Sequence, residues 1–296
     1  MAYPSTPLSY PRNAEGRRPR GRRAAVWGGV LAAAAATVFS AGTPAPAATG
    51  AHPDVVAAPG WVKTQGKARV TAAVLDLDGS GGKPLVYGAD VRYDTASIIK
   101  VDILATALLQ AQDAGHGLTA EQRAEAEVMI ERSDNAAANA LWRQIGLAPG
   151  LEAANKRLGL TSTHGGPGAK WGLTRTTASD QIRLLRAVFG TGTAGKGGSK
   201  ALSQASRTYI RTLMNRIAGE QAWGVSAAAD SGWALKNGWL QRTTTGLWDV
   251  NSVGRIAVGK HHYLVAVLSD GNTSMKDGVA LVERAARTAV ASATAG

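Results

Sequence analysis

The stretch Tyr93–Lys100 (YDTASIIK) continues without a break into the apolar segment Val101–Leu109, and the rest of the chain is organised around it. Hydrophobic residues occur on nearly every face of residues 97–114, and Gly115 follows as a stop signal, so we expect a helix there. A helix that is apolar on all sides is buried. The pattern therefore predicts a buried helix in the middle of a helical domain.

The start of this helix carries a hydroxyl and an amine three residues apart. Ser97 and Lys100 therefore share one helix face. An uncharged Lys100 is placed to take the proton of Ser97 as that oxygen attacks a carbonyl, which is the chemistry of acyl transfer. By itself a Ser-x-x-Lys pattern arises by chance in many chains, and a first-turn serine followed by a surface lysine is its commonest explanation. Other residues must converge on the same point before the pair acquires a function.

The composition favours one globular domain, or at most two, and excludes cysteine chemistry. The chain has 296 residues, of which 45% are hydrophobic, enough for a sizeable core. It has no cysteine, which excludes thiol nucleophiles, disulfides and cysteine-ligated zinc. The formal charge is +12, but residues 1–47 hold six arginines and one glutamate, which leaves 27 basic and 20 acidic residues, a net charge of +7. We expect a solvated cationic surface and no nucleic-acid partner, with attraction to an anionic cell wall as an alternative.

Residues 1–47 have the pattern of an export signal peptide. A polar, arginine-rich segment precedes an apolar run over residues 24–42, and Ala45-Pro46-Ala47 is a small-x-small cleavage site. We expect cleavage and a protein that is secreted or associated with the cell envelope. An uncleaved membrane anchor is the alternative, because the apolar run is nearly long enough to span a bilayer, although it is weakly hydrophobic. The pair Arg22-Arg23 suggests, without deciding, twin-arginine export. Residues 48–64 read as a linker, and residues 65–296 as the folded domain.

The order of expected elements in this domain predicts an α+β fold. The expected strands are residues 70–77, 84–91, 233–241, 247–258 and 263–269, the first two forming a hairpin around the turn at 78–82. Further helices are expected from the capping box Thr119–Gln122 to 131 and over residues 136–145, 151–158, 178–189, 204–216 and 275–291, with a glycine-rich connector at 190–199. We expect one antiparallel sheet formed from both chain ends and flanked by terminal helices. An all-helical subdomain is inserted, and the site lies in the crevice between the two.

Two short motifs within this framework each have an ordinary structural explanation. Ser133-Asp134-Asn135 lies between two expected helices, where these residue types are preferred helix N-caps. Lys236-Asn237-Gly238 lies on an expected strand, where a glycine marks a bulge or a place where a ligand approaches the backbone. No His-Glu-x-x-His motif and no phosphate-binding glycine loop after a strand is present, and His261-His262 lies next to the last strand, where adjacent residues point to opposite faces. We therefore expect no metal and no other cofactor.

Three short motifs, taken together, resemble those of the class A β-lactamase and penicillin-binding DD-peptidase superfamily. They are Ser97-Ile98-Ile99-Lys100, Ser133-Asp134-Asn135 and Lys236-Asn237-Gly238. Their order and the intervening helical insertion are similar as well. The segment Ser133–Asn139 (SDNAAAN) is very like the corresponding family segment. The resemblance covers roughly residues 68–296, essentially the whole mature domain.

The resemblance implies catalytic roles for three side chains. Ser97 would be the acylated nucleophile, and Lys100 its general base or part of its proton relay. Ser133 would pass a proton to the leaving nitrogen of the substrate. To act near neutral pH, Lys100 needs a pKa lowered by about three units, which burial and a second cation such as Lys236 would provide.

The resemblance also implies a set of substrate contacts. Asn135 would hydrogen-bond the substrate's side-chain amide, and Lys236, followed by Asn237 and Gly238, would recognise the substrate carboxylate. The backbone N–H groups of Ser97 and Trp239 would form the oxyanion hole, the first of them at a helix start where the dipole favours negative charge.

Three departures from the family pattern qualify what the resemblance implies. Class A β-lactamases carry a deacylating glutamate in a loop that corresponds to residues 161–177, and here that loop has no acidic residue. His164 in this loop is an alternative base, although a lone loop histidine is more often polar surface. Ser97 and Ser133 are only 36 positions apart, which predicts a more open crevice. Asn237 stands where the family usually has threonine or serine, which puts carboxylate recognition in question.

The sequence therefore predicts an exported, monomeric serine hydrolase that forms an acyl-enzyme at Ser97 with a β-lactam or a peptidoglycan-type amide and deacylates slowly. Its partner would be that small-molecule or cell-wall peptide substrate, with a membrane contact only through an uncleaved leader. The alternative is a catalytically inactive protein of the same fold that binds or acts as a scaffold at the cell envelope.

Overall fold

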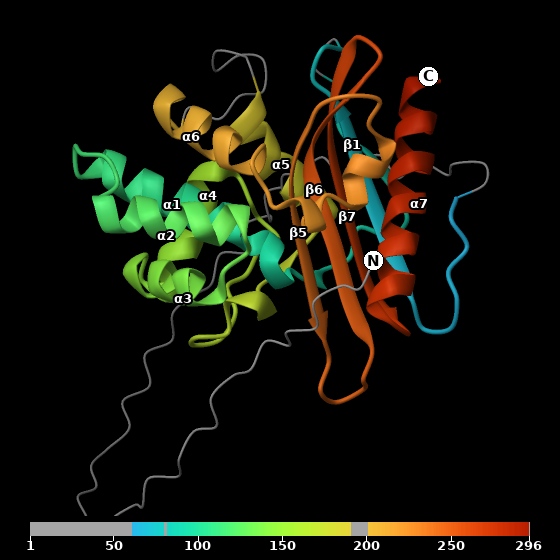
Figure 1. Cartoon of the computed structure of the whole chain (residues 1–296), viewed down its shortest axis with the longest axis horizontal. Coiled ribbons are helices and arrows are strands. Elements are labelled where there is room, and N and C mark those ends of the chain that lie inside the picture. The colour runs from blue at the N-terminus through green and yellow to red at the C-terminus, as the bar shows by residue number, and fades with distance from the viewer. Residues whose placement is uncertain (1–60, 80–81, 191–200, 296) are drawn as a thin grey trace, which may run out of the picture. The chain divides into compact units, whose positions relative to one another are not determined.

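The computed structural model describes residues 61–79, 82–190 and 201–295, all in one compact unit, and its framework is a five-stranded antiparallel sheet. The strand order is β2-β1-β7-β6-β5 (Figure 1). The strands are β1 (Arg69–Asp76), β2 (Leu85–Tyr87), β5 (Trp233–Gln241), β6 (Trp248–Val258) and β7 (His261–Asn272). The N-terminal hairpin pairs with the last strand, β1 against β7, which confirms the expected sheet built from both ends of the chain.

The helices follow the expected order. They are α1 (Ile99–Asp113), α2 (Ala120–Glu131), α3 (Asn135–Gln144), α4 (Leu147–Leu158), α5 (Ala178–Phe189), α6 (Gln204–Met214) and α7 (Met275–Thr294). The capping box predicted at the start of α2 is present, because Thr119 Oγ1 accepts from the Gln122 N–H and Gln122 returns a bond to the Thr119 N–H. The fold class is thus confirmed, with most boundaries within a few residues of the sequence expectation.

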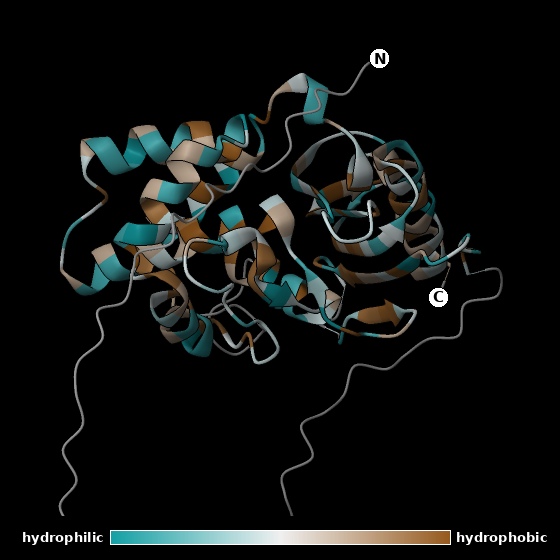
Figure 2. Ribbon diagram, turned by 90° about the horizontal axis from the view of Figure 1, so that it is seen from below, coloured by the Kyte–Doolittle hydropathy of each residue, from teal (hydrophilic) through white to brown (hydrophobic). Residues whose placement is uncertain are grey.

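The helices lie on both faces of the sheet, as Figure 1 shows, with α1–α6 on one side and α7 on the other. The strands alternate accordingly. On β1, Ala73 and Leu75 belong to the hydrophobic cluster of the helical side, whereas Val70, Ala72 and Val74 belong to the cluster under α7. We call these the helical face and the α7 face of the sheet. In Figure 2 several of the helices show both brown and teal stretches, as expected for helices with one buried and one exposed side.

Three details differ from the expectation. The predicted helix over 97–114 begins as a single 3₁₀ turn, η1 (Ala96–Ile98), which continues directly into α1. A short ladder that the sequence did not indicate pairs β3 (Tyr93–Asp94) with β4 (Arg175–Thr176). Of the terminal helices expected beside the sheet, α7 is present, and the described segment before β1, residues 61–68, contains no helix.

The predicted signal peptide over 1–47 and the glycine-rich connector at 190–199, apart from Gly190, lie outside the described residues, as does most of the predicted linker over 48–64. Within the part of the chain that the structure describes, no helix has the length and hydropathy needed to cross a membrane.

Candidate active site

Ser97 lies in η1, in a backbone segment that is held in an unusual conformation. The preceding residue, Ala96, has a φ of 46°, a left-handed conformation that is uncommon for residues other than glycine and clusters at functional sites. The amide of Asn251, from the centre of β6, donates to both Asp94 O (2.9 Å) and Thr95 O (3.1 Å). The sheet thereby fixes the segment that leads into Ser97. Ser97 itself is buried, with 7% of its surface exposed.

Strand β5 is the edge strand next to η1, and Gly238 makes this approach possible. A Cβ at Gly238 would lie 2.6 Å from Ser97 N and 2.8 Å from Ile98 N, closer than such atoms ever come in proteins. The sequence offered a bulge or a ligand as the reason for this glycine, and the structure shows that the backbone of the nucleophile turn comes close instead. Lys236, two residues earlier on the same strand, points to the same helical face.

Ser133 lies between two buried amines. Its Oγ is 3.1 Å from Lys100 Nζ and 3.0 Å from Lys236 Nζ. Ser133 has a φ of 56°, and its own carbonyl accepts from Lys100 Nζ at 2.6 Å. One residue from each of the three motifs therefore meets here. Lys100 comes from α1, three residues after Ser97 of η1, Ser133 comes from the α2–α3 connection, and Lys236 comes from β5.

Burial sets the proton affinity of both lysines. Each side chain is fully buried. Desolvation lowers the pKa of Lys100 well below 10.5, the positive charge of Lys236 lowers it further, and Asp134 opposes the shift. Desolvation lowers the pKa of Lys236 to about 7. These are the causes that the sequence anticipated, and burial and the charge of Lys236 both favour the unprotonated amine.

An unprotonated Lys100 has two hydrogens and one lone pair to place. Its Nζ is within donor distance of Ser133 O (2.6 Å) and of Asn135 Oδ1 (2.8 Å). Those two acceptors account for both hydrogens, and the lone pair then faces the third contact, the Ser133 hydroxyl, whose Oγ is 3.1 Å away and can donate to it. Asn135 is therefore part of the site, and its amide oxygen orients the lysine while its Nδ2 remains a donor for another group.

Asn237 occupies a different position from the one its motif implied. Its side chain is fully buried, and its Nδ2 donates to Gln221 O (2.7 Å) and Trp223 O (3.0 Å). The reason is alternation along β5: Lys236 points to the helical face, so Asn237 points to the other face. With both amide hydrogens bonded to backbone, Asn237 supports the segment beneath the site and is not placed to bind a substrate carboxylate.

The backbone N–H groups of Ser97 and Trp239 remain the predicted oxyanion hole. Ser97 N lies at the start of η1 against Gly238, and Trp239 follows Gly238 on β5. Trp239 pairs in register with Val250 of β6. Both residues lie where β5 approaches η1, and their role as an oxyanion hole stays a prediction.

The sequence missed two residues that contact the lysines. Gln221 Oε1 is 3.5 Å from Lys236 Nζ, and Nζ also donates to Asn237 O at 2.9 Å. The indole of Trp171, in the loop over 161–177, lies against Lys100, with Nζ 4.9 Å from the ring centroid. A tryptophan in a glycine-rich loop was the only signal for the second contact. His164, the alternative base in that loop, is exposed, and its backbone pairs with Arg175.

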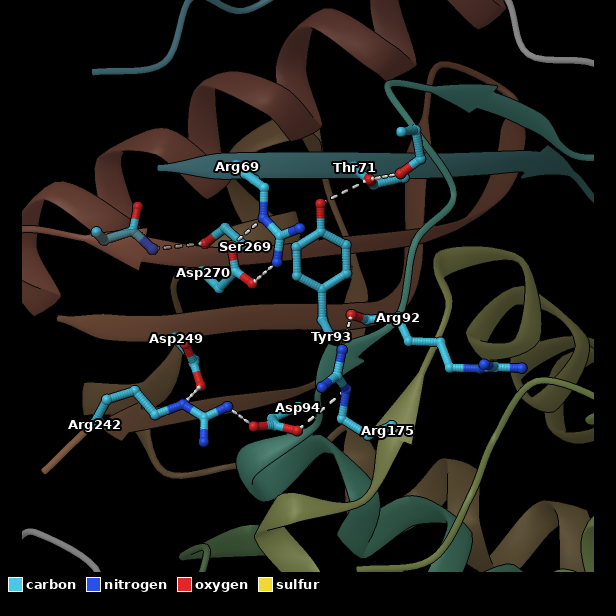
Figure 3. A network of polar contacts seen from close by, with 12 residues as sticks. Arg69, Thr71, Arg92, Tyr93, Asp94, Arg175, Arg242, Asp249, Ser269 and Asp270 are labelled. Atoms are coloured by element: carbon cyan, nitrogen blue, oxygen red, sulfur yellow. Dashed lines mark hydrogen bonds and ion pairs between the residues drawn. The ribbon is translucent and has the colours of Figure 1, made fainter. Parts of the chain in front are cut away.

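A network of charged groups lies beside the segment that precedes Ser97 (Figure 3). Arg242, which directly follows β5, forms ion pairs with Asp94 and with Asp249, the latter at 2.8 Å. Arg175 adds a third contact, 3.4 Å from Asp94. Burial raises the pKa of Asp249 to about 6, and Arg242 opposes that shift. The network ties the β5–β6 hairpin and the 161–177 loop to the nucleophile segment.

Within the described residues, no group of three or more histidine, aspartate or glutamate side chains is arranged to hold a metal ion. The polar groups that meet at the two lysines are the Ser133 hydroxyl and the side-chain amides of Asn135 and Gln221. This donor set suits proton transfer and acyl chemistry.

The fold and the convergence of the three motifs define a class of protein, the β-lactamase and transpeptidase-like serine enzymes and their relatives. A sequence model of the Beta-lactamase enzyme family matches residues 119–293, more than half of the chain, and the chain belongs to that family. No curated protein matches the sequence.

Solved structures share the fold at low sequence identity. A mutant of PBP-A, described as an acyl-enzyme complex with penicillin G, has a TM-score of 0.63 and 20% identity over 78% of this chain and 92% of its own. The TLA-1 extended-spectrum β-lactamase has a TM-score of 0.65 and 15% identity over 76% of this chain and 92% of its own. A class A β-lactamase from Bacteroides cellulosilyticus has a TM-score of 0.64 and 15% identity over 77% of this chain and 93% of its own. These similarities concern the fold.

Proposed function

We propose that this protein is a serine acyl-transfer enzyme in which Ser97 is acylated by a β-lactam or a peptidoglycan-type amide. The observation that carries the proposal is the position of the Ser133 hydroxyl, 3.1 Å from one buried amine and 3.0 Å from another. Two fully buried lysines bridged by one hydroxyl lower the stability of the folded state, because burial disfavours their charge. A role in proton transfer would explain why both lysines are buried at this place.

Acylation uses these groups in sequence. Ser97 Oγ attacks the substrate carbonyl, and its proton passes to the lone pair of Lys100. The oxyanion is stabilised by the backbone N–H groups of Ser97 and Trp239. As the tetrahedral intermediate collapses, the carbonyl carbon–nitrogen bond breaks, and the Ser133 hydroxyl gives its proton to the leaving nitrogen. Lys100 then returns a proton to Ser133, and the charge of Lys236 favours this transfer.

Several finer parts belong to the same proposal. Lys236 is the cation available for a substrate carboxylate, and Asn135 Nδ2 is the donor available for a substrate carbonyl. We propose that deacylation is slow, since the loop over 161–177 has no acidic residue. Export through the leader over 1–47, a location in the cell envelope or outside the cell, and a monomeric state complete the proposal; the leader's sequence pattern supports the first two.

The test is covalent labelling of the purified mature protein by a fluorescent penicillin, with Ser97→Ala as the control. We expect a stable adduct on the wild type and none on the variant. Absence of an adduct with penicillins and with simple acyl esters would reject the enzyme and favour the alternative, a non-catalytic binding protein of the same fold. An adduct on Ser97→Ala would show that another residue is labelled.

A further inference from the structure

The indole of Trp171 is fixed against the amine of Lys100. Trp171 is 1% exposed and Lys100 is 0% exposed, and Nζ lies 4.9 Å from the ring centroid. The indole Nε1 donates to Asn139 Oδ1 at 2.7 Å, which sets the orientation of the ring. An aromatic face therefore covers one side of the amine, while Ser133 and Asn135 supply its polar contacts.

The loop that carries Trp171 is bonded to the segment that carries the nucleophile. The Thr95 N–H donates to Thr174 O at 2.8 Å, and this contact directly continues the antiparallel ladder of β3 and β4. The 3₁₀ turn η2 (Trp171–Leu173) packs next to η1, which contains Ser97. The loop that carries the indole is thus bonded directly to the segment that carries Ser97, and the indole itself contacts Lys100.

Hydrolysis of an acylated Ser97 needs space for water beside a base. The water oxygen bonds to the ester carbonyl carbon as one proton moves to Lys100. The bond from Ser97 Oγ to that carbon then breaks, Lys100 returns the proton to Oγ, and the product leaves as a carboxylic acid that ionises in solvent. This step requires a water molecule within hydrogen-bond distance of Lys100 Nζ.

We propose that Trp171 determines the lifetime of the acyl-enzyme by filling the space beside Lys100 that a hydrolytic water would need. The proposal rests on the proposed function, acylation of Ser97, and adds a physical reason why a hydrolytic water would be kept away from Lys100. A smaller side chain would leave a cavity bordered by the Lys100 amine and the Asn139 amide oxygen. A cavity with two polar partners can hold water.

The experiment compares Trp171→Ala, Trp171→Leu and Trp171→Phe in the full mature chain labelled with fluorescent penicillin. The rate of adduct formation and the rate of adduct loss are measured separately. We expect Trp171→Ala to lose its adduct at least about tenfold faster than wild type, because general base catalysis then becomes available. Trp171→Leu should fall between, and Trp171→Phe should stay within about threefold of wild type.

Trp142 provides a matched control in the same region. Like Trp171, it is 1% exposed. It belongs to α3, and its Nε1 donates to Gly168 O of the same loop at 2.8 Å, whereas the Nε1 of Trp171 donates to Asn139. Trp142→Leu should loosen the loop without opening space beside Lys100, so its adduct should persist as in wild type.

Three outcomes overturn the inference. They are an unchanged lifetime in folded Trp171→Ala and Trp171→Leu, an equal loss of lifetime in Trp142→Leu, and a shorter lifetime in Trp171→Phe equal to that in Trp171→Ala. Circular dichroism establishes which variants are folded, and Trp171→Leu serves if the alanine variant is not. If wild type forms no adduct, the proposed function fails and the inference with it, whereas an adduct of unchanged lifetime in the variants rejects the inference alone.

Discussion

The two faces of strand β5 use the same backbone for different purposes. On the helical face, Lys236 and Gly238 meet the nucleophile turn and the Ser133 hydroxyl. On the α7 face, Leu235 is part of the apolar cluster, and Asn237 bonds to the backbone at Gln221 and Trp223. One face buries ionisable groups for chemistry, and the other buries neutral groups for stability. Adjacent positions of one short motif therefore have different roles, and substitutions on each face should have different effects.

The largest effect is expected from Gly238→Ala on the helical face. The added Cβ would lie within 2.8 Å of three backbone atoms of residues 95–98, so β5 or η1 must shift. Because misplacement by about 1 Å can reduce a rate by about 10²-fold, we expect adduct formation to slow by about that factor or more. Stopped-flow labelling with fluorescent penicillin measures the rate.

Gly232→Ala is the matched control, because a Cβ there meets nothing within 4 Å. It should label at the wild-type rate. Equal labelling by Gly238→Ala and wild type would contradict the role of this glycine in the approach of β5 to the nucleophile.

Lys236→Met should reveal the cost of a buried amine on the helical face as a dependence of stability on pH. The folded state holds the pKa of Lys236 at about 7, against about 10.4 in an unfolded chain. Between these values the unfolded wild type binds more protons than the folded protein, so its free energy of unfolding rises with pH by about 1.4 kcal/mol per unit relative to the variant. The advantage of Lys236→Met is therefore largest at or below pH 7 and disappears toward pH 10.5.

Urea denaturation at a series of pH values measures this slope. Leu235→Met, the neighbouring position on the α7 face, is the control and should differ from wild type by a constant amount. A difference between Lys236→Met and wild type that does not vary from pH 7 to pH 10 would show that Lys236 is not desolvated as the structure indicates.

Asp102→Asn should give the opposite slope from the same side of the sheet. Asp102 is fully buried on α1, and burial raises its pKa to about 8, with Asn155 opposing the shift and Asp180 adding to it. A raised carboxyl pKa means that the folded state holds the proton, so wild-type stability relative to the variant falls as pH rises from about 4 to about 8. Thermal unfolding of both proteins between pH 4 and pH 8 measures the difference, and parallel curves would contradict the assignment.

The smallest effect is expected from Asn237→Thr on the α7 face, although this variant restores the usual residue of the family motif. Threonine cannot reproduce both bonds to Gln221 O and Trp223 O, and one buried carbonyl then loses its partner. We expect a loss of about 1 to 3 kcal/mol in the free energy of unfolding and no faster labelling by penicillin. A threonine variant that labels faster at unchanged stability would return position 237 to the substrate site.

The sequence predicted the elements more accurately than their junctions. The capping box of α2 is a local signal and matches the structure, and the strand expected over residues 233–241 is β5. The transition from η1 to α1 and the β3–β4 ladder depend on contacts with distant segments, so local periodicity did not reveal them. Positions 1–60 lie outside the described residues, and the predicted leader stays a prediction.

The same division holds for the site. The resemblance of three short motifs to those of a known family brought Ser97, Lys100, Ser133 and Lys236 together as a hypothesis. Only the tertiary structure decided which face of β5 Lys236 takes, because the packing of the sheet sets that choice, and alternation along the strand then turns Asn237 to the opposite face. It also placed Trp171 against Lys100, because close packing joins segments 71 positions apart by shape, which no local pattern encodes.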